Sequence, residues 1–569
     1  MRDILAYLKP HAGRMTLGFV IKFIGTIMDL FLPWILAYLI DEVVPLRSVP
    51  LILLWGGAMV VCSVIALVGN IVANRMASRV ARDTTESIRH DLYKKTAYLS
   101  ARQMDWFTVP SLESRLTSDT YNVHQMIGMM QRLGVRAPIL LLGGVLVTLT
   151  LEPVLTLVLV STLPLIGIVV YLVSKKGIPM YTKLQQAVDS MVRTVRENVS
   201  GIRVIKALSK SEYEKQRFTK VNRDVVARDT KAGITMAVTN PVMNLFLNLG
   251  LTLVVIVGAF RVNAGVSQPG KIIAFMTYFI IILNAMLMVT RMFVMVSKGS
   301  ASAGRISEVL NAGEDLSIQP LPQVGKAHVE FQNVSFAYHK SETVGGISFS
   351  LKQGETLGII GATGSGKSTI INLLMRLYDV NKGRVLIGGR DVKSIPSEEL
   401  HRMFGVVFQN DYLMADTIAA NIDFGRNLPR EQIEAAASAA QASEFIDSLA
   451  DGYDHMLTAK GTNLSGGQKQ RLLIARALAG KPPILILDDS SSALDYRTDL
   501  KLRQAIREEY AGTTTVIVAQ RVSSIKHANH ILVLEDGQII GSGTHEELMD
   551  SCGIYQEISR SQMGGEGLA

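Results

Sequence analysis

A glycine-rich stretch at residues 361–369 has the composition of a phosphate-binding loop. It reads GATGSGKST, which fits the P-loop spacing G-x-x-x-x-G-K-[ST]. Its glycines let successive backbone N–H groups turn toward one concave point, where they can bind phosphate oxygens. Lys367 is expected to reach the β- and γ-phosphates of a nucleotide, and Ser368 is expected to bind Mg²⁺. The candidate phosphate-binding residues are Gly361, Thr363, Gly364, Ser365, Gly366, Lys367, Ser368 and Thr369.

The segments on either side of this loop have the patterns of a strand and a helix. Residues 356–360 form an apolar run that predicts a buried strand, and residues 370–376 predict a helix. A helix that begins at the loop adds the positive end of its dipole to the phosphate site. This context favours a nucleotide-binding loop over the alternative, a glycine-rich turn without a ligand.

Other polar residues follow predicted buried strands further along the chain. The apolar run at 483–489 ends in Asp488 and Asp489, and the run at 515–521 ends beside Gln520. The segment LSGGQ at 464–468 comes directly before a helical pattern, and residues 328–338 alternate as strands do. We therefore expect an α/β domain over residues 328–569. A linker at 313–327 with two prolines precedes it.

The first 312 residues have a different composition. Of the whole chain of 569 residues, 48% are hydrophobic and the mean hydropathy is +0.27, which is too apolar for an ordinary soluble protein. The charged fraction of 19% is too high for a chain that lies in a membrane throughout. Apolar segments near the ~20 residues needed to cross a bilayer lie at 15–40, 51–74, 133–151, 153–174, 241–262 and 272–296. The expected fold is an all-α membrane domain of six helices over residues 1–312, followed by the α/β domain.

The basic residues indicate how these spans are oriented. Lys and Arg concentrate in the long connections at about 75–132 and 175–240, which the positive-inside rule places in the cytoplasm with both termini. Connections of this length are too long for simple loops. We expect spans two to five to continue past the membrane as helices, closed by short transverse segments at 107–119 and 210–218. The alternative is a pair of surface hairpins without a role.

Net charge and cysteine content restrict the function further. A charge of +9 would also suit nucleic-acid binding, but the basic residues follow the spans and no aromatic-basic surface pattern is present, so no nucleic-acid partner is expected. Cys62 and Cys552 fall in different predicted domains, which argues against a disulfide framework. The first residues lack a cleavage site after a short apolar stretch, so no cleaved signal peptide is expected.

Polar residues inside the spans are candidates for a substrate cavity. Asp29 lies near the middle of the first span, and Asn244 and Asn248 lie one turn apart on the fifth. The two asparagines could instead form hydrogen bonds between helices. Lys22 could line the same pathway or reach the membrane surface. The methionines of the sixth span suit a pocket for varied apolar ligands, or they serve helix packing alone.

Together these motifs resemble those of ATP-binding cassette (ABC) exporters of the half-transporter type, over essentially the whole chain. Residues 196–207 are also similar to the second intracellular loop of these exporters. The resemblance implies that ATP and Mg²⁺ are bound and that the transverse segments are coupling helices that touch the cassettes. It implies that Tyr338 stacks on adenine, that Gln409 contacts Mg²⁺, and that Asp488 holds Mg²⁺ through water. The signature motif of the family corresponds to Ser465, Gly466, Gly467 and Gln468. The resemblance implies that this motif contacts the γ-phosphate held by the opposite cassette. It also implies that Asp495 lies at the dimer contact.

Two residues depart from the family pattern. The family's catalytic glutamate after Asp488 is replaced here by Asp489, which is one methylene shorter, and the switch histidine is replaced by Gln520. A displacement of about 1 Å in a catalytic group can cost on the order of 100-fold in rate. Gln can donate a hydrogen bond but cannot become cationic. We therefore expect a site that holds ATP but hydrolyses it poorly.

The resemblance and these departures lead to one expected function. The chain would be one subunit of a heterodimeric exporter of amphipathic or drug-like substrates in a bacterial plasma membrane. Its partner would be a second half-transporter with Glu and His at the two altered positions, and the intact signature motif would complete the partner's catalytic site. The alternatives are a dedicated peptide or lipid exporter, a slow homodimeric exporter, and an ATP-gated channel or regulator.

Overall fold

The computed structural model describes residues 2–339, 341–409, 411–490 and 493–563. These residues form two compact units. The first contains the residues up to Tyr98 together with Val109–Ala312. The second contains Leu99–Thr108 and the residues from Gly313 onward. The segment Leu99–Thr108, which we expected in the membrane domain, thus packs with the second unit.

Six helices in the described part of the first unit are long and apolar enough to span a membrane. They run over Asp3–Leu46, Val49–Ala97, Val109–Leu151, Pro153–Ser200, Ser211–Asn263 and Pro269–Leu310. The elements that compose them are α1 (Arg2–Ala6), η1 (Lys9–His11), α2 (Ala12–Tyr38), η2 (Leu39–Val43), η3 (Val44–Leu46), α3 (Val49–Ala97), α5 (Val109–Ser114), η4 (Arg115–Asp119), α6 (Thr120–Pro138), η5 (Ile139–Gly143), α7 (Gly144–Leu151), α8 (Pro153–Ser200), α10 (Ser211–Ala237), α11 (Thr239–Asn263) and α12 (Pro269–Leu310). The prediction of six spans with long helical extensions is confirmed.

The tight hairpin between the third and fourth spans has a local cause. Glu152 is extended (φ −161°, ψ 100°), which ends α7, and Pro153 is the first residue of α8. Proline suits this position because the first N–H of a helix has no partner within it. The Glu152 carboxylate accepts an ion pair from Arg261 of α11 at 2.8 Å. Three spans therefore meet at this end of the unit.

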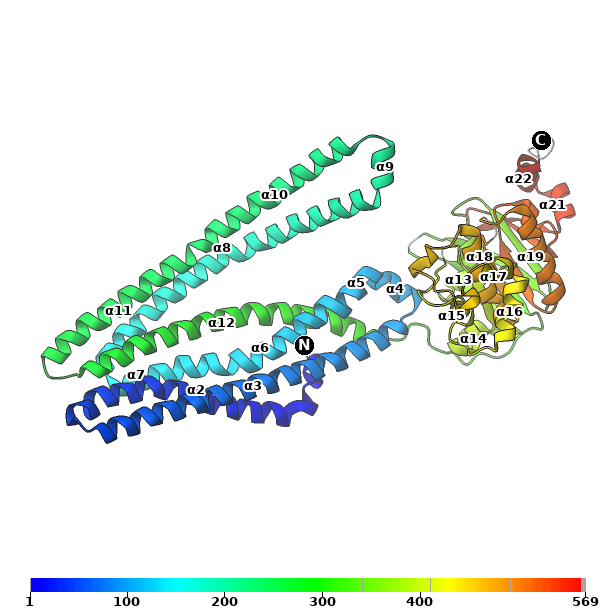
Figure 1. Ribbon diagram of the computed structural model, residues 1–569. Coiled ribbons are helices and arrows are strands. Elements are labelled where there is room, and N and C mark those ends of the chain that lie inside the picture. The colour runs from blue at the N-terminus through cyan, green and yellow to red at the C-terminus, as the bar shows by residue number, and fades with distance from the viewer. Residues whose placement is uncertain (1, 340, 410, 491–492, 564–569) are drawn as a thin grey trace. The chain divides into compact units, whose positions relative to one another are not determined.

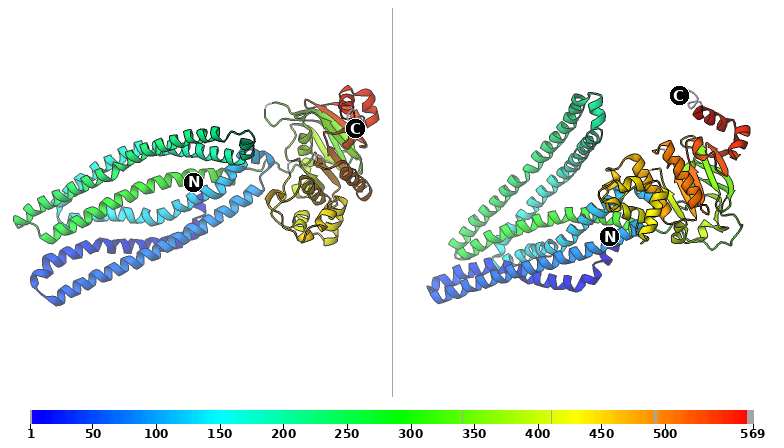
Figure 2. Two further views of the ribbon diagram at one scale, coloured as in Figure 1. Left: turned by 45° about the horizontal axis from the view of Figure 1, so that its top comes forward. Right: turned by 45° about the vertical axis from the view of Figure 1, so that its right-hand side comes forward.

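The helices of the first unit form two groups (Figures 1 and 2). Helices α2, α3, α6 and α12 run side by side, whereas α8 and α10 form an antiparallel pair joined by the short helix α9 (Ile202–Ala207). In the core, the Tyr278 hydroxyl of α12 donates a hydrogen bond to the carbonyl of Leu30 on α2 at 2.5 Å. The surrounding contacts are apolar side chains of α2, α8, α11 and α12.

Both predicted transverse segments were misplaced. The short helix that crosses between α8 and α10 is α9, and residues 210–218 instead begin the long helix α10. Ser209 has a left-handed conformation (φ 53°), which ends α9 before α10 begins. In the other connection the separate short helix is α4 (Ala101–Phe107), and residues 109–119 already belong to the third span. Ser100 caps α4 together with Gln103, a capping box that the sequence contains and that we overlooked.

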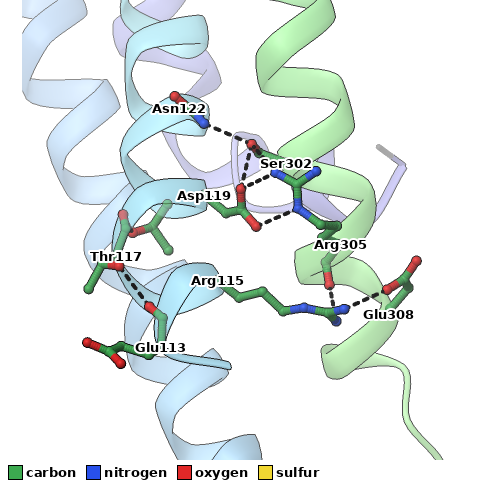
Figure 3. A network of polar contacts seen from close by, with 9 residues as sticks. Glu113, Arg115, Thr117, Asp119, Asn122, Ser302, Arg305 and Glu308 are labelled. Atoms are coloured by element: carbon green, nitrogen blue, oxygen red, sulfur yellow. Dashed lines mark hydrogen bonds and ion pairs between the residues drawn. The ribbon is translucent and has the colours of Figure 1, made fainter. Parts of the chain in front are cut away.

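A polar network joins the start of the third span to the end of the sixth (Figure 3). Asp119 is 1% exposed; it accepts a hydrogen bond from Ser302 at 2.8 Å and forms an ion pair with Arg305 of α12. One turn away, Arg115 donates to the Arg305 carbonyl at 2.8 Å and pairs with Glu308 at 3.0 Å. Because both elements lie next to the segments that lead into the second unit, the network fixes these two ends to each other.

The second unit is an α/β domain with two sheets, as predicted. The smaller sheet is antiparallel, in the order β2 (Val344–Leu351), β1 (Val329–Phe336), β4 (Lys382–Ile387), β5 (Arg390–Asp391). The larger sheet has the order β10 (Gln538–Gly543), β9 (His530–Glu535), β3 (Thr356–Gly361), β8 (Thr514–Val518), β7 (Ile484–Asp488), β6 (Phe404–Val407). All its neighbouring pairs are parallel except β10–β9. The carboxyl ends of β3, β7 and β8 therefore meet at one edge, which is where ligands bind in such sheets.

Helices cover this sheet and form a further cluster beside it. Helix α13 (Lys367–Leu374) follows β3 and packs with both sheets in one apolar core. The others are α14 (Ser397–Arg402), α15 (Ile418–Asp423), α16 (Arg430–Ala439), α17 (Ser443–Asp447), α18 (Gly466–Ala479), α19 (Tyr496–Glu509), α20 (Val522–Ile525), α21 (His545–Ser551) and α22 (Gly553–Met563), with short turns η6 (Val392–Ser394), η7 (Gly452–Asp454) and η8 (Ala459–Gly461). Helices α15 to α18 share a second core rich in alanine.

Candidate nucleotide-binding site

The glycine-rich loop joins β3 to α13 and requires glycine at two of its positions. Gly366 has φ 95° and is the residue before the first turn of α13. A Cβ at Gly366 would lie 2.5 Å from Cγ1 of Val344, and one at Gly361 would lie 2.2 Å from the carbonyl oxygen of Leu534. Side chains at these positions would collide with fixed neighbours. The loop is thus held close to the sheet edge, directly before the start of the helix.

Lys367 lies folded over the loop. Its Nζ donates hydrogen bonds to the carbonyls of Gly361 at 2.9 Å and Ala362 at 2.7 Å. Burial lowers the pKa of Lys367, and the carboxylates of Asp488 and Asp489 oppose that shift. The ammonium group can leave these two carbonyls for phosphate oxygens, which are stronger acceptors.

Asp488 and Ser368 form the part of the site that suits a metal ion. Asp488 ends β7 and is 5% exposed, and the Ser368 hydroxyl donates to its Oδ2 at 3.0 Å. Burial raises the pKa of Asp488, whereas the hydrogen bond from Ser368 and the charge of Lys367 lower it. A hydroxyl and a carboxylate side by side are the hard oxygen ligands that Mg²⁺ prefers, with phosphate and water completing its shell. The residues present therefore fit the expected ion.

The two residues that depart from the family pattern are bonded to each other. The Gln520 amide donates to Asp489 Oδ2 at 3.0 Å. Asp489 has a left-handed backbone (φ 51°) and its N–H donates to the Val518 carbonyl at 2.9 Å. Burial raises the pKa of the Asp489 carboxyl, and the charges of Lys367 and Arg521 oppose that shift. Both side chains thus lie on one wall of the site.

One cavity of about 270 Å³ brings these groups together. It contains ten of the predicted residues and two, Thr343 and Val518, that the sequence analysis did not single out. Its lining residues are Thr343, Thr363, Gly364, Gly366, Lys367, Ser368, Thr369, Gln409, Asp488, Asp489, Val518 and Gln520. Gly361 and Ser365 lie behind this surface in the loop, and the Ser365 Oγ is buried without a hydrogen-bond partner in the described structure. The chain segments that form the cavity lie between residues 343 and 520.

Tyr338 lies outside that lining but carries an exposed ring. It is 39% exposed, packs edge-on against Phe336 and Tyr378, and accepts a hydrogen bond from Asn372 at 3.1 Å. Tyr378 was not predicted. Its hydroxyl donates to Asp105 of α4 at 2.5 Å, so the short helix α4 contacts the aromatic cluster that contains Tyr338.

The signature residues and Asp495 do not line this cavity. Ser465 caps α18 in a capping box with Gln468, with bonds of 2.9 and 3.3 Å. Gly466 and Gly467 form the first turn of that helix. Asp495 caps α19 by accepting from the N–H and hydroxyl of Thr498 at 2.9 and 2.7 Å. Within one chain these residues therefore cap or begin helices, and they do not belong to the site formed by the chain's own phosphate loop.

The candidate cavity residues of the membrane unit are not gathered in one place. Asp29 forms an ion pair with Arg136 of α6 at 3.0 Å, a partner we had not predicted, and Asn70 of α3 lies at 3.5 Å. Of the two alternatives for Lys22, the one in which it reaches the membrane surface is wrong. Lys22 is 3% exposed and donates a hydrogen bond to Asn74 of α3 at 3.0 Å. Asn244 and Asn248 are exposed on α11, with no side-chain hydrogen bond to the described residues.

A phosphate loop, a carboxylate–hydroxyl pair and a polar wall share one cavity here, and the described residues include six helices of membrane-spanning length. These features define a membrane protein with a P-loop nucleotide-binding domain.

Comparison with known proteins identifies the family. Residues 15–286 match the ABC transporter transmembrane region, and residues 344–492 match the ABC transporter nucleotide-binding model. An uncharacterised ABC transporter ATP-binding protein of Bacillus subtilis, YfiB, is 35% identical over 100% of this chain and 99% of its own length. The chain therefore belongs to the ABC transporter family, as one half-transporter that joins a membrane region to an ATPase domain.

Other proteins are similar over most of their length. An uncharacterised ABC transporter ATP-binding protein of Mycobacterium tuberculosis is 31% identical over 99% of each chain. Bacillus subtilis YknU is 34% identical over 83% of this chain and 82% of its own. A solved structure of a bacterial Atm1-family ABC exporter with ATP bound covers 99% of each chain with a TM-score of 0.82 at 24% identity. This last likeness concerns the fold, which is that of ABC exporters.

Proposed function

We propose that this chain is the subunit of a heterodimeric ABC exporter whose own ATP site is degenerate. Its phosphate loop, Tyr338 and the pair Ser368–Asp488 would hold Mg²⁺-ATP. Hydrolysis would occur mainly at the second site, built from the partner's loop and this chain's signature residues 465–468. ATP binding would close the two cassettes and open the membrane cavity outward, and hydrolysis would reset it.

The observation that carries this proposal is the pair Asp489–Gln520. A base that activates water must reach it in the line of attack, and Asp is one methylene shorter than the family's Glu. The hydrogen bond of 3.0 Å from Gln520 further directs the carboxylate toward its neighbour. Gln520 also cannot supply the positive charge of a histidine to the γ-phosphate. Both substitutions weaken hydrolysis while leaving the ATP-binding loop unchanged.

The remaining features of the proposal concern its surroundings. We assign the protein to a bacterial plasma membrane with both termini cytoplasmic, because the basic residues lie in the long connections. We assign the substrate to amphipathic or drug-like molecules. The methionines of α12 and the Asp29–Arg136 pair would offer such molecules both an adaptable apolar surface and charge. Residues 313–327 serve as the linker between the membrane domain and the cassette.

The test is ATPase activity of the chain purified alone and of the complex with its partner. We expect little turnover from the chain alone and substrate-stimulated turnover from the complex. In the complex, Asp489→Asn should leave most activity, whereas Ser465→Ala should remove it, because Ser465 would complete the partner's site. If the chain alone shows full turnover, and Asp489→Asn abolishes that turnover, the protein is instead a homodimeric exporter with Asp489 as base.

A further inference from the structure

Helices α2 and α3 form a groove on the face that turns away from α6. The two helices approach closely where Gly25 faces Gly69: a Cβ on Gly69 would lie 3.5 Å from the Gly25 Cα. A hollow of about 390 Å³ surrounds this crossing, lined apart from these glycines by Ile21, Ile24, Val64, Ile65 and Val68. A second hollow of about 600 Å³ is lined by Arg14, Val72, Met76, Arg79 and Arg82.

The two hollows lie in line along one face of the helix pair. On α3 their residues recur every three or four positions, from Val64 through Val68, Val72 and Met76 to Arg79, which places them on one side of a helix. Asn70 and Asn74, which bond to Asp29 and Lys22 of α2, belong to another side. The distance from Ile65 to Arg79 along the helix is roughly 20 Å at 1.5 Å per residue. One leaflet of hydrocarbon measures about 15 Å, so the groove spans one leaflet and its headgroup region.

The charges at the basic end are not balanced within the protein. Asp83 pairs with both Arg14 at 3.3 Å and Arg82 at 2.7 Å. Arg79 has no hydrogen bond or ion pair to any residue that the structure describes. Three guanidinium groups against one carboxylate leave a local charge of 3 − 1 = +2. The side chains of Arg14 and Arg82 are 63% and 68% exposed, so an anion can reach them.

We propose that this groove binds an anionic glycerophospholipid. Its phosphate would lie among Arg79, Arg14 and Arg82, and an acyl chain would lie over Met76 and Val72 toward the Gly25–Gly69 crossing. The apolar floor and the basic end match the two parts of one lipid, and basic pockets between membrane helices bind lipid headgroups in this way. Only 6% of the most apolar stretch of α3 is buried, which leaves this face to the bilayer. The assignment rests on the proposed orientation, which places the basic end at the cytoplasmic leaflet.

The experiment uses the purified complex of this chain with its partner, in nanodiscs that contain equal amounts of phosphatidylglycerol and phosphatidylcholine. Lipids that remain bound after transfer to a zwitterionic detergent are counted by native mass spectrometry. We expect phosphatidylglycerol to be retained over phosphatidylcholine by about tenfold or more, from the two excess charges. Arg79→Gln should reduce that retention about fivefold, the effect of one basic residue. The control is Arg193→Gln, which changes an exposed arginine of α8 outside the groove.

Further variants separate the lipid from other occupants. Val68→Trp should fill the apolar hollow and reduce retention although all three arginines remain. Glycerol phosphate in excess should compete only weakly; full displacement by it would show a headgroup site without a bound chain and overturn the lipid assignment. Equal retention of both lipids would also overturn the lipid assignment, and so would an equal effect of the Arg79 and Arg193 variants. A cross-link from Val68→Cys to the partner chain would overturn it as well, because the partner would then occupy the groove. Because lipid retention requires no hydrolysis, these results are independent of whether the ATP site is degenerate.

Discussion

In the function we propose, the side chains of Asp489 and Gln520 are what make this ATP site degenerate. Their hydrogen bond of 3.0 Å uses one carboxylate oxygen of Asp489 and an N–H of the Gln520 amide. This bond holds the carboxylate through Oδ2 and so limits how far it can turn toward an attacking water molecule. Asp489 is also held by its backbone, whose left-handed conformation (φ 51°) Asp tolerates better than most residues do. Under the proposed function, this wall of the site helps to hold the nucleotide but does not activate the attacking water.

The double substitution Asp489→Glu with Gln520→His should restore hydrolysis at this site. The longer carboxylate reaches the attacking water and the histidine adds positive charge near the γ-phosphate. We expect a gain on the order of 100-fold, measured as ATPase of a complex whose partner has lost its own catalytic carboxylate. Asp489→Glu alone should give a smaller gain. Unchanged turnover in the double variant would mean that another feature limits hydrolysis.

The affinity of the site for Mg²⁺ should depend on pH through Asp488. Burial raises the pKa of Asp488 above its ordinary value, and only the deprotonated carboxylate binds the ion. As the pH falls, protonation therefore competes with Mg²⁺ at a higher pH than for an exposed Asp. Titration of Mn²⁺ with the ATP-loaded protein, followed by electron paramagnetic resonance, should show the affinity falling with acidification. Asp488→Asn should bind more weakly and lose this pH dependence, whereas Asp536→Asn, in the turn between β9 and β10, should retain it.

At the scale of elements, the short capped helix α4 belongs with the nucleotide-binding unit. Helix α4 is capped by Ser100, which also donates to Asp315 at 2.8 Å, and Gln103 donates to the Gly313 carbonyl at 2.6 Å. With the bond from Tyr378 to Asp105, these contacts fix α4 to the nucleotide-binding unit.

Removal of the buried carboxylate of Asp119 should loosen the joint between the third and sixth spans. Asp119→Ala would leave Arg305 and Ser302 without their acceptor, and loss of one partner of a buried ion pair costs about 3–5 kcal/mol. Because the Arg305 side chain is 47% exposed, we expect about 2 kcal/mol, seen as a lower thermal unfolding temperature in detergent.

The matched control for that variant is Asp224→Ala on α10. Asp224 pairs with Arg228 at 2.8 Å, but both side chains are about half exposed, so its loss should cost at most about 0.5 kcal/mol. The unfolding temperature of Asp119→Asn should lie between those of the Asp119→Ala and Asp224→Ala variants. Equal unfolding temperatures for the Asp119 and Asp224 alanine variants would contradict a structural role for the network.

At the scale of the whole molecule, the six spans and the basic connections predict which loops face each side of the membrane. In a background with Cys62→Ala and Cys552→Ala, Val266→Cys lies in the exposed turn between α11 and α12. It should react with a membrane-impermeant maleimide added outside intact cells. Leu208→Cys, exposed after α9, should react only once the membrane is opened. The opposite labelling pattern would reverse the proposed orientation.

The sequence by itself determined those features that depend on local order. The glycine spacing of residues 361–369, the apolar runs of the strands and the six spans could all be predicted, because backbone freedom and hydrophobic period act over a few residues. Both sheets contain the predicted strands, and the helices are, as expected, much longer than the ~20 residues that cross a bilayer. The first of the misplaced transverse segments is an exception, because its local signal, the capping box at Ser100, was present but overlooked.

Tertiary structure alone decided which distant residues meet. Nothing in the sequence pairs Gln520 with Asp489, Arg136 with Asp29 or Tyr378 with Asp105, since each pair joins separate elements. The same holds for the groove, where arginines of α2 and α3 come together because those two helices pack side by side. Such contacts depend on how helices and strands pack, and the packing is set by the sum of many side-chain contacts rather than by any one stretch of chain.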